Sequence, residues 1–254
     1  TFSDNHMIRI KNERQIEGIR SSCDLLSLLY EKLKLQVQPG NTPKDLDRFA
    51  YDFIIKHGGK PAFLGYEGYP ATLCISVNEV VIHGIPNDRP FHEGDIVGID
   101  SGINLNGYFS DAAITLPVGS IAQETQKLLK VTRESLELAI EQVKPHARVS
   151  DISRAVFSHA TKNGFKLVRQ YCGHGVGLEI HEDPQIPNYV SPGPNPRLMP
   201  GMVIAIEPMI NIGTSDVRVL DDDWTVVTMD GSLSAHFEHT VLVTDSGHEV
   251  LTKW

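Results

Sequence analysis

The sequence has few cysteines, no excess of basic residues and no long apolar run. Its three cysteines, Cys23, Cys74 and Cys172, are widely spaced, which argues against a disulfide framework and predicts a reducing compartment, the cytoplasm. A net charge of −9 gives no support to a nucleic-acid or anionic-membrane binder. No segment approaches the roughly 18 apolar residues that span a bilayer, and the first ten residues lack the apolar core of a signal peptide.

A β-hairpin over residues 94–111 is the strongest local signal, with Asn106-Gly107 as its two-residue turn. A type I′ turn needs φ > 0 at both central positions, which Asn-Gly accepts readily. This turn places Gly102 opposite Asp111, and Asp100 then shares their face of the hairpin. Diagonal neighbours have Cβ atoms roughly 7–8 Å apart or less, so the two carboxylates repel, take up protons or share cations. The hairpin therefore predicts half of a metal site, and the alternative is a solvated polar face.

Amphipathic helices are predicted on both sides of the hairpin. Apolar residues at steps of three and four predict helices over residues 12–38 and 121–143. A further helix begins at Thr42-Pro43, with threonine as N-cap and proline at the first helical position. These helices and the intervening strands indicate an α+β protein.

The helical pattern repeats along the chain. A shift of 106 residues places the apolar stripe of the first helix on that of the helix over 121–143, and Asp45 on Asp151. A shift of 107 places Asp100 on Glu207, each at the end of a predicted strand. The repeat predicts an internal duplication, with two halves related by an approximate twofold. Their strands would form one antiparallel or mixed sheet with helices packed on one side, and equivalent carboxylates would meet near the axis.

Five side chains are candidate metal ligands. Four are carboxylates and one is an imidazole, with no thiolate, a set that suits Mn, Fe(II), Co or Zn. The candidates are Asp100, Asp111, His174, Glu207 and Glu238. The glycines around His174 do not have dinucleotide-loop spacing, and Cys172 lacks the neighbouring cysteine of a thiolate site.

The chain resembles the type I methionine aminopeptidases of the pita-bread metallopeptidase superfamily, which includes aminopeptidase P and prolidase. The resemblance spans residues 8–250 and is carried by the motifs CISVNEVVIHGIP (74–86), GDIVGIDSG with SDAA (94–113), CGHGVG (172–177), IEPM (206–209) and SAHFEHT (234–240). It implies one catalytic domain over 1–254, with a leader at 1–10 and duplicated halves at 11–118 and 119–250. The implied fold is a curved sheet with helices on its outer side.

The resemblance also assigns roles within the site. It implies two divalent ions, with Asp111 and Glu238 as the bridging pair, and a hydroxide activated between the ions that attacks the first peptide bond. Glu207 would relay a proton toward the leaving amine. His181 would hydrogen-bond the carbonyl oxygen, and His83 the leaving nitrogen.

A methionine pocket is implied by the same resemblance. Its lining falls on Phe63, Tyr66, Tyr69, Cys74, Ile180 and Trp224. Many bacterial relatives carry a cysteine at the position of Phe63 and a phenylalanine at the position of Ile180. In this chain the larger side chain therefore lies on the opposite wall of the pocket. A sodium-like monovalent site is implied near Asn78, Val80 and Ser234.

The function expected from the resemblance is removal of the initiator methionine from nascent chains and peptides whose second residue is small. We expect a cytoplasmic monomer that acts close to the ribosome, without a nucleic-acid motif. Two alternatives stay open: an X-Pro aminopeptidase or prolidase-like enzyme, and a non-catalytic binding protein on the same fold.

Overall fold

The computed structural model describes residues 7–254, so most of the expected leader over 1–10 lies outside the described residues. The α-helices are α1 (Glu13–Leu33), α2 (Pro43–Lys56), α3 (Gln123–Ile140) and α4 (Val149–Lys162). The helix expected over 12–38 is shorter than predicted, because the chain after Leu33 tightens into a 3₁₀ turn, Lys34–Gln36, before it reaches Pro39. A second 3₁₀ turn covers Tyr66–Gly68.

Two of the helices begin in the same way. The N–H of Thr42 donates to the Asp45 carboxylate at the start of α2, and the N–H of Arg148 donates to the Asp151 carboxylate at the start of α4, both at 2.9 Å. A carboxylate in the first helical turn satisfies a free backbone donor and interacts favourably with the helix dipole. These aspartates are the two that the 106-residue shift superposes.

Short strands fill the space between the helices. They are β1 (Lys60–Pro61), β2 (Cys74–Val77), β3 (Val80–Ile82), β4 (Ile96–Leu105), β5 (Tyr108–Pro117), β6 (Lys166–Leu167), β7 (Gly173–Gly175), β8 (Glu182–Ile186), β9 (Val203–Ile206), β10 (Met209–Asn211), β11 (Val217–Val219), β12 (Val226–Thr228), β13 (Ser234–His236), β14 (His239–Val243) and β15 (His248–Val250).

The pairings between these strands are antiparallel, as expected, but the strands do not form one continuous sheet. They divide into four hydrogen-bonded groups: β1-β4-β2 with β5 beside β4, β13-β10-β6, β11-β12-β3, and β15-β14-β9-β7-β8. One physical reason is Pro208, which has no N–H for a ladder and separates β9 from β10. An antiparallel bridge between Ala113 and Glu238 links the first group to the second half of the chain.

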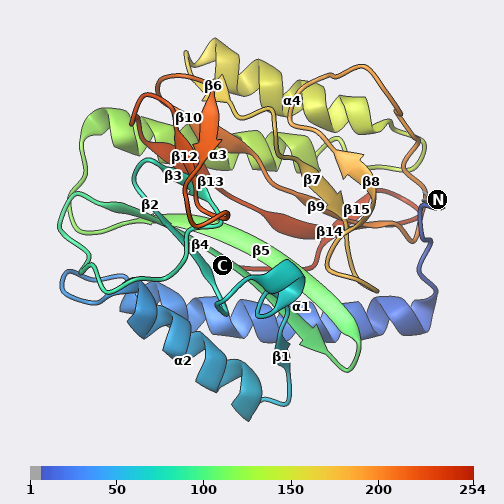
Figure 1. Cartoon of the computed structure of the whole chain (residues 1–254). Coiled ribbons are helices and arrows are strands. Elements are labelled where there is room, and N and C mark those ends of the chain that lie inside the picture. The colour runs from blue at the N-terminus through green and yellow to red at the C-terminus, as the bar shows by residue number, and fades with distance from the viewer. Residues whose placement is uncertain (1–6) are drawn as a thin grey trace.

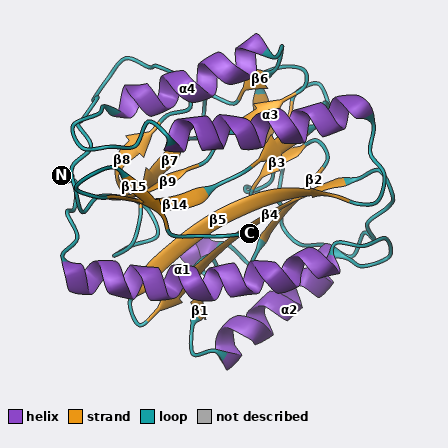
Figure 2. Cartoon of the chain, turned by 180° about the vertical axis from the view of Figure 1, so that it is seen from behind, coloured by secondary structure: helices purple, strands orange, loops and turns teal. Residues whose placement is uncertain are grey.

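The helices pack in pairs against this set of strands. Figure 1 shows α1 and α2 along one edge of the strands, and α3 and α4 along the opposite edge. Seen from behind in Figure 2, α1 and α3 run in front of the strands. Leu26 of α1, Leu136 of α3 and Ile99 of β4 belong to one buried apolar cluster, so the main core lies between helices and strands. No helix of residues 7–254 is both long and apolar enough to cross a membrane.

The hairpin has the predicted register. Asn106 and Gly107 have φ of 54° and 87°, Leu105 pairs with Tyr108, and Gly102 pairs with Asp111. The hairpin consists of β4 and β5, and α1 packs behind it, where the Tyr30 hydroxyl donates to the Ile99 carbonyl at 3.1 Å. The turn thereby sets the register of the two strands, and the packing of α1 against the hairpin fixes which of its faces carries Asp100 and Asp111.

Candidate active site

Five separate backbone segments position the predicted ligands. Asp100 and Asp111 lie on β4 and β5, and His174 lies on β7. Glu207 follows the last residue of β9, and Glu238 lies between β13 and β14. The N–H of Glu238 donates to the Ala113 carbonyl at 2.8 Å, which brings the last ligand against the hairpin. The structure therefore brings together all five residues that were predicted as ligands.

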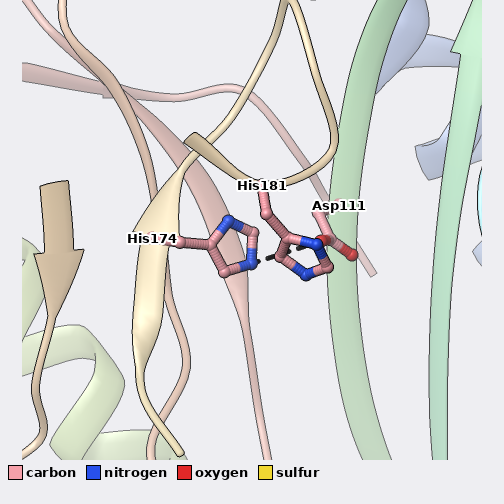
Figure 3. A group of neighbouring side chains, drawn as sticks. All are labelled: Asp111, His174 and His181. Atoms are coloured by element: carbon pink, nitrogen blue, oxygen red, sulfur yellow. Dashed lines mark ion pairs between the residues drawn. The ribbon is translucent and has the colours of Figure 1, made fainter. Parts of the chain in front are cut away.

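The side chains of the five predicted ligands converge on one point. Atoms of Asp100, Asp111 and Glu238 lie within 4.8 Å of one another, and so do atoms of His174, Glu207 and Glu238. His174 Nε2 lies 3.6 Å from Asp111 Oδ2 and 3.4 Å from Glu207 Oε1. Figure 3 shows His174 facing Asp111, with the His181 ring beside them. Glu238 belongs to both carboxylate groups, so its position suits a bridging ligand.

Oxygen atoms in this cluster lack partners within the described chain. Asp100 Oδ1, Asp111 Oδ1 and Glu238 Oε1 are fully buried and accept no hydrogen bond from any described residue. A buried carboxylate oxygen without a donor costs free energy, and a divalent cation would remove that cost. Carboxylate oxygens with one imidazole nitrogen suit Mn, Fe(II), Co or Zn, so the residues present fit a divalent metal site.

The electrostatics of the metal-free cluster favour its neutral forms. Burial raises the pKa of Asp100 to about 7 and that of Glu207 to about 8. Burial, followed by the neighbouring carboxylates, raises the pKa of Asp111 and Glu238 well above the usual range. Burial lowers the pKa of His174 to about 3, which keeps a nitrogen lone pair available. Cations would reverse the preference of the carboxylates for the protonated form.

Two further histidines, His83 and His181, line the same cavity as the carboxylate cluster, and ligand atoms of His181, Asp111 and His174 lie within 4.8 Å of one another. His181 Nδ1 lies 2.9 Å from the Tyr66 hydroxyl, and its ring centroid is 4.4 Å from that of His174. His83 follows β3 with φ of 57°, and its ring packs edge-on against Tyr171 at 5.7 Å. Burial lowers the pKa of both histidines, to about 4 for His83, so both are neutral at neutral pH.

A cavity of about 730 Å³ opens over the cluster. All five ligands, both flanking histidines and five of the six predicted pocket residues line it: Phe63, Tyr66, Tyr69, Cys74 and Trp224. The sixth, Ile180, does not line the cavity directly but packs with Phe63, Tyr69 and Cys74 in an apolar cluster behind its wall.

Two other residues contribute to the site and carried no role in the sequence prediction. His236 is buried, and its Nε2 lies 3.3 Å from Glu207 Oε2, on the opposite side of that carboxylate from His174. The sequence did contain a signal for His236, because this residue precedes the predicted ligand Glu238 by two positions in a strand-like motif. Tyr171 lines the cavity beside His83. It had no sequence signal, because only the fold brings residue 171 next to residue 83.

Comparison with known proteins agrees with this geometry. The family model for metallopeptidase family M24 matches residues 17–245. A methionine aminopeptidase of Treponema pallidum is 52% identical over 248 residues, which are 97% of each chain. The chain belongs to metallopeptidase family M24. The crystal structure of a methionine aminopeptidase from Thermotoga maritima superposes with a TM-score of 0.95 at 44% identity, over 98% of this chain and all of that one.

Within family M24 the chain is closer to methionine aminopeptidases than to proline-directed relatives. A prolidase from Pyrococcus furiosus matches with a TM-score of 0.79 at 26% identity, and the match covers 96% of this chain but 65% of the prolidase. The pita-bread fold expected from the sequence is confirmed by these superpositions.

Proposed function

We propose that this M24 enzyme removes the N-terminal methionine from peptides and nascent proteins whose second residue is small. The observation that carries the proposal is one cavity with two walls. One wall holds the buried carboxylates and His174, and the other is apolar and ends in aromatic rings and the Cys74 thiol. A flexible thioether side chain suits such a wall because sulfur packs favourably against aromatic rings.

Two divalent ions, chosen among Mn, Fe(II), Co and Zn, would be held by the five clustered ligands. Asp100 would complete one ion site and His174 with Glu207 the other, with Asp111 and Glu238 shared between them. Bound there, such ions lower the pKa of a water and polarise a carbonyl group. Among the described residues, two groups of possible ligand atoms share Glu238, which supports two adjacent ions; a third group joins Asp111 and His174 to His181, the histidine assigned to the substrate.

The chain's own histidines would act on the substrate as neutral imidazoles. If the Tyr66 hydroxyl donates to His181 Nδ1, the ring proton lies on Nε2, which can then donate to the carbonyl oxygen. His83 lies across the cavity beside Tyr171, where it can hydrogen-bond the leaving nitrogen. Glu207, whose two carboxylate oxygens face His174 and His236 at the cavity, is placed to carry a proton toward the leaving amine.

Further expectations accompany this function. The enzyme would act as a cytoplasmic monomer near the ribosome, as one catalytic domain with halves at 11–118 and 119–250. A monovalent cation would bind near Asn78, Val80 and Ser234. The Ser234 hydroxyl, which is buried and has no hydrogen-bond partner among residues 7–254, supports that site, whereas the Asn78 amide already bonds Asp95 and the Ile96 N–H.

Metal titration of chelated protein tests the proposal. Activity on Met-Ala-Ser should be absent after chelation and should return with the addition of two equivalents of one of these ions. Gly-Pro should stay uncleaved under the same conditions. Preferential cleavage of Gly-Pro would favour a prolidase-like enzyme, and full activity without bound metal would refute the mechanism.

A further inference from the structure

The turn between β7 and β8 carries two residues of the site, Ile180 and His181. A buried ion pair lies at its end: Lys11 Nζ lies 2.6 Å from Glu182 Oε2, and each side chain is 1% exposed. Lys11 immediately precedes the N-cap of α1, whereas Glu182 is the first residue of β8. The pair therefore joins the first helix of the chain to the turn that presents His181.

The second carboxylate oxygen of Glu182 organises the turn itself. Its Oε1 accepts the backbone N–H of Leu178 at 2.6 Å and that of Glu179 at 3.0 Å. One carboxylate thus fixes the backbone just before Ile180 and ties it to Lys11.

Lys11 is held in place from the opposite side. Its backbone N–H donates to the Gly201 carbonyl at 2.9 Å. Gly177, at the start of the turn, has φ of 131°, and a Cβ there would lie 2.4 Å from Ile19 Cδ1 and 3.4 Å from Lys11 Cε. The lysine stem and α1 therefore form a close-fitting support for the turn backbone.

The two residues on this turn, His181 and Ile180, contact the ligand cluster and the apolar pocket residues, respectively. A Cβ at Gly102 would lie 3.0 Å from Ile180 Cδ1 and 2.9 Å from Phe63 Cε1, so these side chains occupy the space above the glycine. The His181 ring lies against the His174 ring and the Tyr66 hydroxyl. A small displacement of the turn would move both residues together.

We propose that Lys11 and Glu182 are positioning residues, which hold the 178–182 turn so that His181 meets the substrate correctly and Ile180 supports Phe63 in the apolar pocket; their effect on catalysis rests on the function proposed above. A buried ion pair contributes little net stability compared with apolar side chains of similar size, so stability alone does not account for it. Its geometric effect is to restrain the turn both through Lys11 and through the two backbone N–H groups that the Glu182 carboxylate accepts. Displacement of a catalytic group by about 1 Å can cost roughly 10²-fold in rate.

The double variant Lys11→Met/Glu182→Gln tests the inference. Removing both charges avoids an unpaired buried ion, and the glutamine oxygen can still accept the two backbone N–H groups. We expect kcat/KM on Met-Ala-Ser to fall by roughly 10- to 100-fold, with kcat and KM both affected because His181 and Ile180 move together. Amide hydrogen exchange over residues 177–183 should accelerate, while exchange in β4 and β5 and the metal content stay at parental values.

The exposed pair Lys44 and Asp88 provides a matched control. It also joins a lysine to a remote carboxylate, but its side chains are 50% and 77% exposed. The variant Lys44→Met/Asp88→Asn should keep kcat/KM within about twofold of the parent, because exposed pairs couple weakly.

Parental kcat/KM together with parental exchange in the 177–183 segment would overturn the inference. If Lys11→Met/Glu182→Gln does not fold, Lys11→Gln/Glu182→Gln is measured in its place by the same two criteria. A parent that cleaves no methionyl peptide would refute the proposed function instead. The exchange measurement would then still decide whether the ion pair holds the turn.

Discussion

At the scale of single residues, His83 offers the clearest separation of chemistry from metal binding. His83 lines the cavity, whereas the clustered atoms that could bind a metal ion belong to other residues. We expect His83→Ala to lower kcat on Met-Ala-Ser by roughly 10²-fold, because a positioned hydrogen-bonding or acid–base group contributes about that much. Metal content measured by elemental analysis should match the parent. Normal turnover in this variant would remove the role assigned to His83.

His236 should act on the metal site through Glu207. Its Nε2 lies 3.3 Å from Glu207 Oε2, while Glu207 Oε1 faces His174. We expect His236→Leu to weaken divalent-metal affinity by roughly 10- to 100-fold, because loss of a group that orients a ligand has that effect. Titration calorimetry of the chelated protein measures this.

The variant His236→Gln serves as the control for that experiment, because it keeps a polar side chain whose amide can donate to the Glu207 carboxylate. It should retain most of the parental affinity. Equal affinities for leucine, glutamine and histidine at this position would show that the contact does not orient Glu207.

At the scale of elements, β4 sets the width of the apolar pocket. A Cβ at Gly102 would lie 2.9 Å from Phe63 Cε1 and 3.0 Å from Ile180 Cδ1. Gly102→Ala should push these side chains toward the substrate and raise KM for Met-Ala-Ser by about fivefold, equivalent to about 1 kcal/mol of overpacking. Steady-state kinetics should show a smaller change in kcat.

Gly98→Ala is a suitable comparison on the same strand and the same face. The Cβ that it adds would lie 3.3 Å from the Ser76 carbonyl oxygen, away from Phe63 and Ile180. An equal rise in KM for both variants would mean that strand distortion, rather than pocket width, is responsible.

The hairpin also explains which features could be predicted from sequence. The Asn106-Gly107 turn determines its own register, and that register places Asp100 and Asp111 on one face without any distant information. The helix stripes were equally local; of the two carboxylates predicted at strand ends, Glu207 directly follows β9, whereas Asp100 lies within β4 because the hairpin continues to Leu105. The 107-residue repeat already related Glu207 to Asp100, whereas His174 and Glu238 could be joined to this face only through the family resemblance, since their approach depends on tertiary packing.

Features that depend on long-range pairing were less predictable. The division of the strands into four groups follows from interruptions such as Pro208 and from loops whose paths carry no periodic signal. Tyr171 and the Lys11–Glu182 pair join segments far apart in the chain, so no spacing rule identifies them. Ile180 was assigned to the pocket lining, but it packs beside Phe63 in the apolar cluster and does not line the cavity itself.

At the scale of the whole molecule, the site draws its ligands from both the N-terminal and the C-terminal parts of the chain. Asp100 and Asp111 lie within β4 and β5, Glu207 follows β9 and Glu238 lies between β13 and β14, so the acidic oxygens gather on strands and strand connections rather than on the helices. Their mutual repulsion opposes folding unless protons or cations are bound. Divalent ions should therefore stabilise the whole domain as well as enable catalysis.

This coupling predicts an unusual dependence of stability on pH. Burial raises the pKa of Asp100 from 3.8 to about 7 and that of Glu207 from 4.5 to about 8. The folded protein therefore binds more protons than the unfolded chain in this window, so these groups make metal-free stability fall as pH rises from about 4 to about 8. A divalent ion replaces the protons and should oppose this fall.

Thermal unfolding of chelated and Mn²⁺-loaded protein at pH 5 and pH 8 measures the effect. The difference between the two melting temperatures should be several degrees larger at pH 8, because at pH 5 protons neutralise the cluster and compete with the metal. In Asp100→Asn/Glu207→Gln the metal-free protein should lose much less stability over this range, since two of the titrating groups are gone. A pH-independent difference in the parent would mean that protons and metal ions do not compete for this cluster, and the assignment of the carboxylates as ligands would fail with it.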